Sequence, residues 1–250
     1  MIQFEQVAKR FGSRQVLDAV TLAIPEGQTT VLMGYSGTGK SVALKHIVGL
    51  LEPDAGRVVV DGQVVHELGY EELMELRRRI GYVFQFAALF DSLNVAENVG
   101  LGLQRQGLDR DAIAVRVAES LRLVELDDAG VRYPAELSGG MRKRVGIARA
   151  IALRPRYILY DEPTTGLDPV TTTAMNDLMI RARRELGATS VVVTHDLSSA
   201  FTVADRIAFL YEGRIRQAGT VAEFRESSDH RVREFIAGRP ETESGAGGRA

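Results

Sequence analysis

Short apolar runs separated by polar turns dominate the start of the chain. Runs at residues 2–7, 16–24 and 29–33 are broken by Gly12-Ser13 and by Pro25-Glu26-Gly27. Short runs that are rich in β-branched residues and bounded by such turns are typical of strands. We therefore predict three strands here, and the apolar third run is predicted to be buried.

The rest of the chain alternates between strand patterns and helical periodicity. Strands are predicted at residues 57–60, 63–65, 80–84, 157–160, 190–194, 206–211 and 214–218. The first two of these flank Asp61-Gly62, which is a strong signal for a two-residue hairpin turn. Helices are predicted after residue 41, from Gly139 onward, and at 71–79, 109–126, 169–186 and 197–204. Strands that alternate with helices indicate an α/β fold with a mainly parallel sheet covered on both faces.

Residues from about 86 to 153 show helical patterns and no strand pattern, so we predict a helical insertion there. It begins with an apolar stretch at 86–95, interpreted either as a local core or as a docking groove for a helix of another protein. In the helix that begins at Gly139, four basic residues are expected to cover the surface beside an apolar stripe: Arg142, Lys143, Arg144 and Arg149. Residues 240–250 are rich in Gly, Glu and Ser and are predicted to be disordered.

The composition of the chain excludes several kinds of functional site. The 250 residues carry a net charge of −2 and no cysteine. Without cysteine the chain forms no disulfide, zinc–thiolate site or catalytic thiol. The charge argues against a strongly basic surface for nucleic acid, so no nucleic-acid partner is expected. The sequence contains neither a signal-peptide pattern nor 18 consecutive apolar residues, so any membrane role is expected to come through a partner.

A phosphate-binding loop lies between the third predicted strand and the helix that follows it. The stretch Gly34-Tyr35-Ser36-Gly37-Thr38-Gly39-Lys40-Ser41 fits the pattern of Gly, four residues, then Gly-Lys-Ser/Thr. Its glycines let successive N–H groups point at a polyphosphate, and the following helix, which begins near Val42, adds the positive end of its dipole. Lys40 is predicted to reach the β- and γ-phosphates, and Ser41 to bind Mg²⁺. The chain is therefore predicted to bind a nucleoside triphosphate.

Two further motifs carry candidate chemistry. Asp161 and Glu162 lie at the carboxyl end of a predicted buried strand, where ligands meet an α/β sheet. Asp161 suits Mg²⁺, and Glu162 is suited to accept a proton from the attacking water. Ser138-Gly139-Gly140, at a helix start, forms a second anion cradle. Because one nucleotide needs only one phosphate loop, the second cradle predicts a head-to-tail dimer in which it faces the partner's γ-phosphate.

Two residues remain ambiguous on the pattern alone. Phe11, which we place in a polar turn at Lys9 to Gly12, either stacks on a nucleobase or packs against its neighbours. His195 follows a predicted strand, and for such a residue a hydrogen-bonded core histidine is the default interpretation.

Taken in order, the phosphate loop, Gln85, LSGGM, YILYDEP, GLD and VVTHD resemble the ATP-binding cassette (ABC) ATPases. The resemblance covers roughly residues 2–237 and implies a P-loop NTPase core, an antiparallel β-subdomain and a helical subdomain at about 86–153, all within an ATP-binding domain at 1–239. It implies that Phe11 stacks on adenine, that Gln85 senses Mg²⁺ and the partner, and that Asp168 communicates across a homodimer. It also implies that His195 is the γ-phosphate switch, and that Asp161 and Glu162 are the Mg²⁺ and base carboxylates of an ATPase.

Two residues depart from the common family pattern: Met141 replaces glutamine after LSGG, and Tyr160 replaces an aliphatic residue before Asp161. The cradle uses backbone N–H groups, so Met141 is not expected to impair it. The stretches GTGKSV, ALFDSLNVAENV, LSGGMRKRVGIARAIAL, LYDEPTTGLDP and VREFIAG resemble the Mla-type ATPases. That resemblance implies phospholipid transport with an MlaE-like membrane permease docking near Phe86–Leu93 and an MCE-domain lipid-binding protein. It places the chain in the cytoplasm, peripheral on the cytoplasmic face of the inner membrane.

Two alternative functions stay open. One is the ATPase subunit of an importer for a polar solute such as an amino acid. The other is a soluble ABC ATPase of DNA repair or translation, although such proteins usually carry twin cassettes, zinc modules or long coiled coils. This chain has one cassette and no cysteine.

Overall fold

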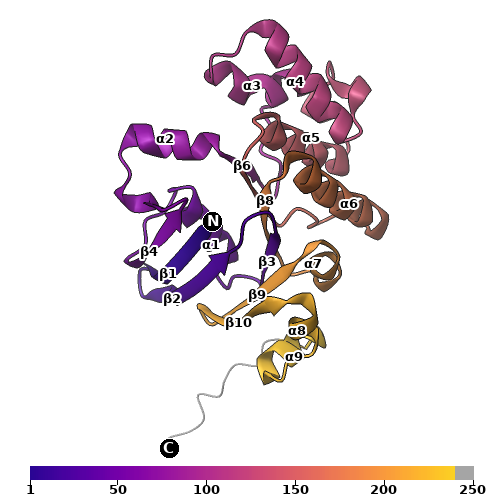
Figure 1. The fold of residues 1–250 in the computed structure, drawn as a ribbon. Coiled ribbons are helices and arrows are strands. Elements are labelled where there is room, and N and C mark those ends of the chain that lie inside the picture. The colour runs from indigo at the N-terminus through magenta and orange to yellow at the C-terminus, as the bar shows by residue number, and fades with distance from the viewer. Residues whose placement is uncertain (240–250) are drawn as a thin grey trace, which may run out of the picture.

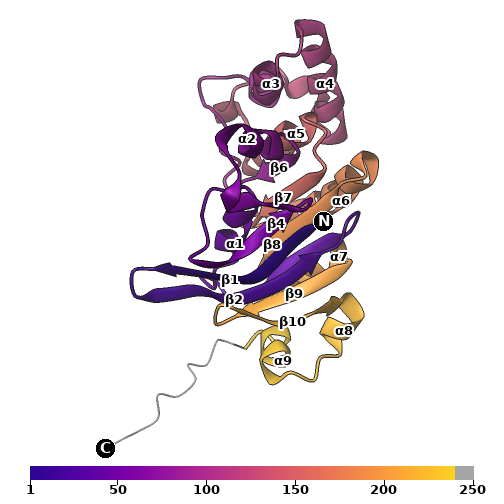
Figure 2. The same cartoon turned by 60° about the vertical axis from the view of Figure 1, so that its left-hand side comes forward.

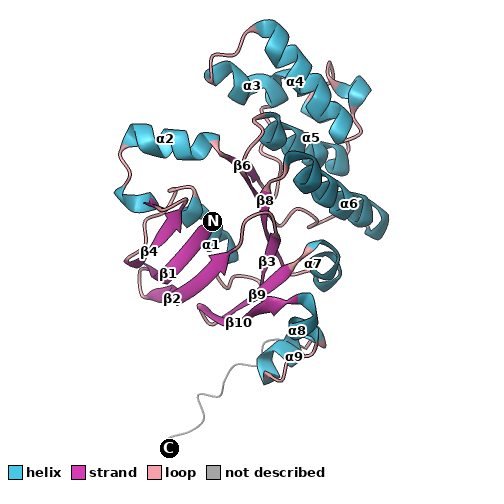
Figure 3. Cartoon of the chain, viewed as in Figure 1, coloured by secondary structure: helices cyan, strands magenta, loops and turns pink. Residues whose placement is uncertain are grey.

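Two sheets organise the protein, and the computed structural model describes residues 1–239 of it. The segment predicted to be disordered, 240–250, lies outside the described residues. The smaller sheet is antiparallel and has the strand order β2-β1-β4-β5 (Figure 3). Its strands are β1 (Ile2–Phe11), β2 (Arg14–Ile24), β4 (Ala55–Val60) and β5 (Gln63–Val64). Asp61 and Gly62 join the last two with φ values of +50° and +82°, as the predicted two-residue hairpin turn requires.

The larger sheet has six strands in the order β10-β9-β3-β8-β7-β6. Only the pair β9–β10 is antiparallel, and the other neighbours run parallel. The strands are β3 (Thr29–Met33), β6 (Ile80–Val83), β7 (Tyr157–Asp161), β8 (Thr189–Thr194), β9 (Arg206–Tyr211) and β10 (Arg214–Thr220). The prediction of a mainly parallel sheet is therefore confirmed.

Helices cover this framework and extend beyond it (Figure 1). The α-helices are α1 (Lys40–Ile47), α2 (Tyr70–Arg78), α3 (Val95–Arg105), α4 (Arg110–Leu123), α5 (Gly139–Ala152), α6 (Pro169–Leu186), α7 (Leu197–Val203), α8 (Val221–Arg225) and α9 (His230–Ile236). Short 3₁₀ turns occur at Val65–Glu67, Asp127–Ala129 and Pro134–Glu136. Helices α3 and α4 lie at one end of the molecule, and α8 and α9 lie at the other (Figures 1 and 2).

The central strands are buried on both faces, and successive side chains enter two different cores. In β3, Val31 and Met33 belong to the core that includes residues of α5, α6 and α7, whereas Leu32 belongs to the core that includes α1 and the antiparallel sheet. In β7, Ile158 and Tyr160 point to the first core. Tyr160, the departure from the family pattern, thus packs as a fully buried core residue.

Two local expectations need correction. Phe11 is the last residue of β1 rather than part of a turn, because β1 pairs with β2 as far as the Phe11–Arg14 position. Helix α3 begins at the last residue of the apolar stretch, and the pattern did not predict it as a separate helix. Its start is set by Asn94, whose side chain accepts the Glu97 N–H at 2.9 Å while Glu97 accepts the Asn94 N–H at 2.8 Å. This reciprocal cap is visible in the sequence as Asn-x-x-Glu.

Candidate active site

The carboxyl ends of β3, β6, β7 and β8 border a cleft of about 460 Å³. Most residues predicted to bind nucleotide line it. Its lining consists of Phe11, Arg14, Val16, Ser36, Gly37, Gly39, Lys40, Ser41, Val42, Gln85, Glu162, Thr165 and His195. The site therefore forms at the edge where ligands bind open α/β sheets.

The phosphate loop is shaped by close approaches of its backbone. A Cβ atom at Gly34 would lie 2.3 Å from the Leu210 carbonyl oxygen, and one at Gly39 would lie 2.8 Å from Val16 Cγ1. Gly39 also has φ +100°, a conformation that favours glycine. The loop can therefore follow this path only without side chains at these two positions.

Lys40 folds back over the loop. Its Nζ donates to the carbonyl oxygens of Gly34 at 2.9 Å and Tyr35 at 2.8 Å, and only 5% of the residue is exposed. Burial lowers the pKa of Lys40, and the charges of Glu162 and Asp161 partly oppose that shift. An ammonium group that is shielded from water interacts strongly with an anion.

The side chains of two other loop residues make structural contacts: Tyr35 contacts the C-terminal region, and Thr38 contacts the loop itself. The Tyr35 hydroxyl donates to the Arg239 carbonyl oxygen at 3.2 Å, and its ring packs edge-on against Phe235 of α9. Thr38 donates to the Tyr35 carbonyl oxygen at 2.9 Å. The side chains of Tyr35 and Thr38 are absent from the lining of the cleft, so what these residues offer a phosphate is their backbone.

Ser41 and Asp161 meet at the bottom of the site. The Ser41 hydroxyl donates to Asp161 Oδ1 at 2.6 Å, and the Tyr82 hydroxyl donates to Asp161 Oδ2 at 3.0 Å. Burial, followed by the charge of Asp161, raises the pKa of Tyr82, so Tyr82 remains a donor at neutral pH. A hydroxyl and a carboxylate at hydrogen-bond distance are hard oxygen ligands that suit Mg²⁺ shared with phosphates. These residues therefore fit the predicted metal.

Glu162 is the most constrained residue of the site. It has φ +49°, which is rare for a residue with a side chain. Its carboxylate lies 3.0 Å from His195 Nδ1, accepts the Thr165 hydroxyl at 3.0 Å, and lies 3.9 Å from Lys40 Nζ. The structure thus brings together Lys40, Glu162 and His195. His195 is half-exposed at the cleft and is not a core histidine.

Sequence reasoning missed Tyr82 and Thr165. Tyr82 lies inside β6, and Thr165 lies three residues after Glu162. Neither residue has a distinctive local pattern. Tyr82 reaches Asp161 from the neighbouring strand, and Thr165 reaches Glu162 across a tight turn.

Phe11 lies at the rim of the cleft with 48% of its surface exposed. Lys9 Nζ is 5.8 Å from its ring centroid. The exposed ring is available to stack on a base.

The second predicted cradle lies outside this cleft. Ser138 caps α5, where its Oγ accepts the Met141 N–H at 3.2 Å. Asp168 caps α6 by accepting the N–H groups of Val170 and Thr171 at 3.0 Å. A Cβ at Gly140 would lie 2.9 Å from Thr171 Cγ2, so the two helix starts are neighbours. Within one chain they do not reach the nucleotide cleft.

The expectation that the basic residues of α5 simply cover its surface is wrong. Lys143 donates to the carbonyl oxygens of Pro163 and Thr165, and Arg149 donates to those of Ala87 and Ala88. Arg142 and Arg144 also donate to backbone carbonyl oxygens. These side chains connect α5 to loops of other elements.

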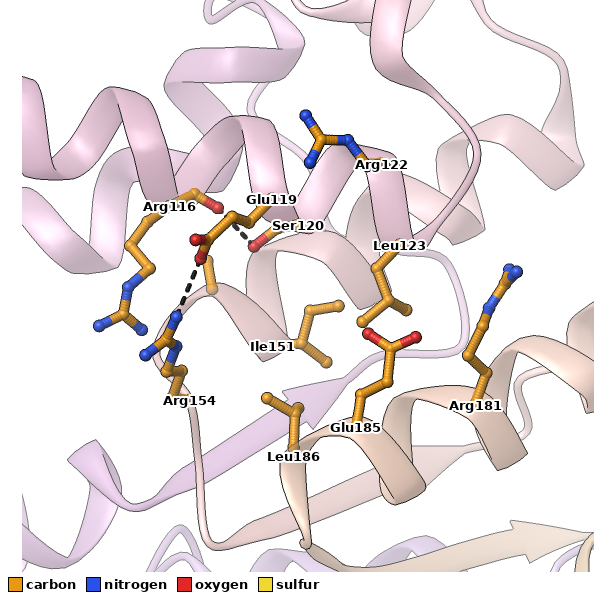
Figure 4. Close-up of a pocket in the computed structure, with 11 residues that line it drawn as sticks. Arg116, Glu119, Ser120, Arg122, Leu123, Ile151, Arg154, Arg181, Glu185 and Leu186 are labelled. Atoms are coloured by element: carbon orange, nitrogen blue, oxygen red, sulfur yellow. Dashed lines mark hydrogen bonds and ion pairs between the residues drawn. The ribbon is translucent and has the colours of Figure 1, made fainter.

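A larger hollow, of about 720 Å³, lies between α4, α5 and α6 (Figure 4). Arg154 there bonds Glu119 at 3.0 Å. Helices α4, α5 and α6 all end at this hollow, and arginine side chains are stabilised near the negative ends of helices. None of the predicted site residues lines it, so we account for its charges by helix stability.

Comparisons with known proteins agree with this geometry. Residues 17–165 match the model of the ABC transporter family. The chain is 40% identical over 239 residues to the probable ribonucleotide transport ATP-binding protein mkl of Mycobacterium bovis, covering 95% of this chain and 67% of the relative. It is 41% identical over 239 residues to the methionine import ATP-binding protein MetN of Caulobacter vibrioides, covering 94% and 72%. Both relatives match nearly the whole chain.

A solved structure extends the comparison to the fold. The ATP-binding cassette MJ0796, a dimer in a post-hydrolysis state bound to ADP and Pi, has a TM-score of 0.81 and 36% identity, covering 88% of this chain and 99% of the other. The chain therefore belongs to the ABC transporter family. It is the ATP-binding subunit of such a transporter and an ATPase. No helix among residues 1–239 is both long enough and apolar enough to cross a bilayer.

Proposed function

We propose that this chain is the ATP-hydrolysing subunit of a Mla-type phospholipid transporter. The observation that carries the catalytic part is the convergence of Lys40, Ser41, Glu162 and His195 at one cleft. Asp161 does not line the cleft but accepts the Ser41 hydroxyl beside it. The lipid part rests on the resemblance of several stretches to the Mla-type ATPases. Residues 1–239 form the ATP-binding domain, with its helical subdomain at about 86–153.

The residues of the cleft divide the work of hydrolysis. Backbone N–H groups of Gly34 to Ser41, together with Lys40, hold the phosphates, and Phe11 stacks on adenine. Ser41, Asp161 and Gln85 hold Mg²⁺, which when bound neutralises charge on the phosphate oxygens. Glu162 accepts the proton of the attacking water. His195 and Thr165 keep its carboxylate in place.

Two copies of the chain complete the sites. Ser138, Gly139, Gly140 and Asp168 lie away from the cleft of their own chain, which suits contact with the nucleotide of a partner. The dimeric state of MJ0796 bound to ADP and Pi supports this arrangement. We therefore propose a head-to-tail homodimer.

The apolar segment after Gln85 receives the permease. Phe86 and Phe90 are 83% and 49% exposed, whereas Leu89 and Leu93 are half-buried, and Leu89 packs against the core. Exposed aromatic side chains are common anchors of protein interfaces. We propose that an MlaE-like permease docks here, that an MCE-domain lipid-binding protein joins the complex, and that the subunit works at the cytoplasmic face of the inner membrane.

Replacing Glu162 by Gln tests the catalytic assignment. The amide keeps the size of the carboxyl group but cannot accept the proton, so hydrolysis should fall by roughly 10²–10⁴-fold while ATP still binds. The variant should accumulate as an ATP-bound dimer, and adding Ser138→Arg should abolish that dimer. ATP turnover and light scattering measure both, with exposed Glu226→Gln as the control. If Glu162→Gln hydrolyses ATP within a few-fold of the wild-type rate, Glu162 is not the general base.

A polar-solute importer is the second candidate, because the relative MetN is named for methionine import and is 41% identical. Transport by the complex of this chain with its permease, reconstituted in lipid, should distinguish the two functions. ATP-dependent transfer of labelled phospholipid to or from the lipid-binding partner supports the first proposal. Amino-acid uptake without lipid transfer would support the importer instead.

A further inference from the structure

Lys143 lies one helical turn after the Ser138-Gly139-Gly140 cradle, on α5. Its Nζ donates to the carbonyl oxygens of Pro163 at 2.9 Å and Thr165 at 2.6 Å. Both acceptors belong to the segment that follows Glu162. One side chain therefore ties the helix that begins with the cradle to the segment that begins with the proposed base.

Thr165 is held at two points. Its carbonyl oxygen receives Lys143, and its hydroxyl donates to the Glu162 carboxylate at 3.0 Å. Glu162 keeps a left-handed backbone conformation at φ +49°, and such conformations persist where surrounding contacts hold them. Loosening Thr165 should therefore loosen the Glu162 carboxylate.

We propose that Lys143 is a positioning residue for ATP hydrolysis that links the location of α5 to the orientation of Glu162. This inference rests on the proposed role of Glu162 as base and of the cradle as the binding site for the partner's nucleotide. When the cradle engages that nucleotide, the position of α5 is fixed. Lys143 then fixes residues 163–165, and with them the base of its own chain. Hydrolysis at one site thus depends on the nucleotide at the other.

The positioning role of Lys143 depends on its ammonium group. The side chain is half-buried, and burial lowers the pKa of Lys143 while the charge of Glu162 opposes the shift. A buried ammonium group needs hydrogen-bond partners, and both carbonyl oxygens supply them. Lys143→Met keeps the methylene packing but removes the donors, whereas Lys143→Arg keeps donors at nearly the same reach.

Steady-state ATP hydrolysis by the purified full-length chain provides the test. Lys143→Met should lower kcat by roughly tenfold or more, because displacing a reacting group by about 1 Å can cost up to about 100-fold. The KM for ATP should change less than about twofold. Lys143→Arg should restore most of kcat. Lys45→Met is the matched control, because Lys45 is an exposed lysine on α1.

Hydrogen exchange without nucleotide gives a second readout, in which the backbone amides of residues 164–168 should exchange faster in Lys143→Met than in wild type. Unchanged kcat in Lys143→Met would overturn the inference. So would equal losses in the Met and Arg variants with lowered melting temperatures, which would indicate packing alone. If wild type and Lys45→Met hydrolyse no ATP, the proposed function fails instead, and unchanged exchange at residues 164–168 would then overturn the Lys143 contact by itself.

Discussion

Two loops leave the same edge of the parallel sheet, and they are held in opposite ways. The phosphate loop after β3 is held mainly by its own side chains, because Lys40 bonds the carbonyl oxygens of Gly34 and Tyr35, and Thr38 bonds that of Tyr35. Two further bonds, from Arg14 to the Gly37 carbonyl oxygen and from Tyr35 to that of Arg239, connect it to neighbouring elements. The segment after β6, residues 84–94, is held by side chains from two helices that follow it in the chain. Most hydrogen bonds that hold the first loop are thus made within it, whereas the second segment depends on the packing of the helical region.

Asn98 of α3 is the main support of the second segment. It is fully buried; its Oδ1 accepts the Phe90 N–H at 2.8 Å, and its Nδ2 donates to the carbonyl oxygens of Phe90 at 3.1 Å and Leu93 at 2.9 Å. Arg149 of α5 donates to the carbonyl oxygens of Ala87 at 2.7 Å and Ala88 at 2.6 Å. Both alanines have positive φ. These bonds hold a strained segment next to Gln85.

The phosphate loop should show the largest effect of a single added methyl group. In Gly39→Ala the Cβ would lie 2.8 Å from Val16 Cγ1 and 3.0 Å from the Val16 carbonyl oxygen. Steric conflict and left-handed strain together should weaken ATP binding by roughly 100-fold. Calorimetric titration with ATP measures the change.

Gly37→Ala is the matched control for that experiment. Gly37 is also left-handed, at φ +76°, but the nearest atom to its Cβ is Arg14 Nη2 at 3.9 Å. Backbone strain without a steric clash should weaken ATP binding by about tenfold. Equal losses in the two variants would contradict the importance of the close approach at Gly39.

The contrast between the loops also explains what the sequence could reveal. The phosphate loop and the strands follow from local patterns, and the rule that parallel strands end at one edge places Glu162 and His195 on the same side of the sheet. Their direct contact was not predicted, because the local pattern favours a core histidine at position 195. The contacts of Lys143 and Arg149 span 20 and 62 residues and end on backbone carbonyl oxygens. Every residue has such an oxygen, so the acceptors leave no pattern in the sequence. Basic residues on α5 therefore looked like an ordinary exposed surface.

Asn98→Ala should give the second largest effect, on stability. The change removes the acceptor of the Phe90 N–H and the side-chain donor of the Leu93 carbonyl oxygen, whereas the Phe90 carbonyl oxygen keeps the Leu93 N–H at 3.1 Å. Each polar group left without a partner in a part-buried setting costs about 1–3 kcal/mol. We expect the free energy of unfolding to fall by roughly 2–4 kcal/mol, as measured by urea denaturation. Asn94→Ala, which removes only the cap of α3, should cost about 1 kcal/mol. A smaller loss for Asn98→Ala than for Asn94→Ala would show that Asn98 does not support the segment.

The smallest effect on the isolated subunit is expected at the exposed tip of the same segment. Phe86 is 83% exposed, so Phe86→Asp should change the free energy of unfolding by less than about 0.5 kcal/mol. On docking, however, the new carboxylate would be buried without a partner, which should weaken binding to the permease by at least tenfold, about 1.4 kcal/mol. Co-purification with the permease measures the loss, and Val115→Asp on α4, where Val115 is 57% exposed, is the control. Equal recovery of the permease with both variants would place the docking surface away from Phe86, and the support that Asn98 and Arg149 give this segment would then serve Gln85 alone.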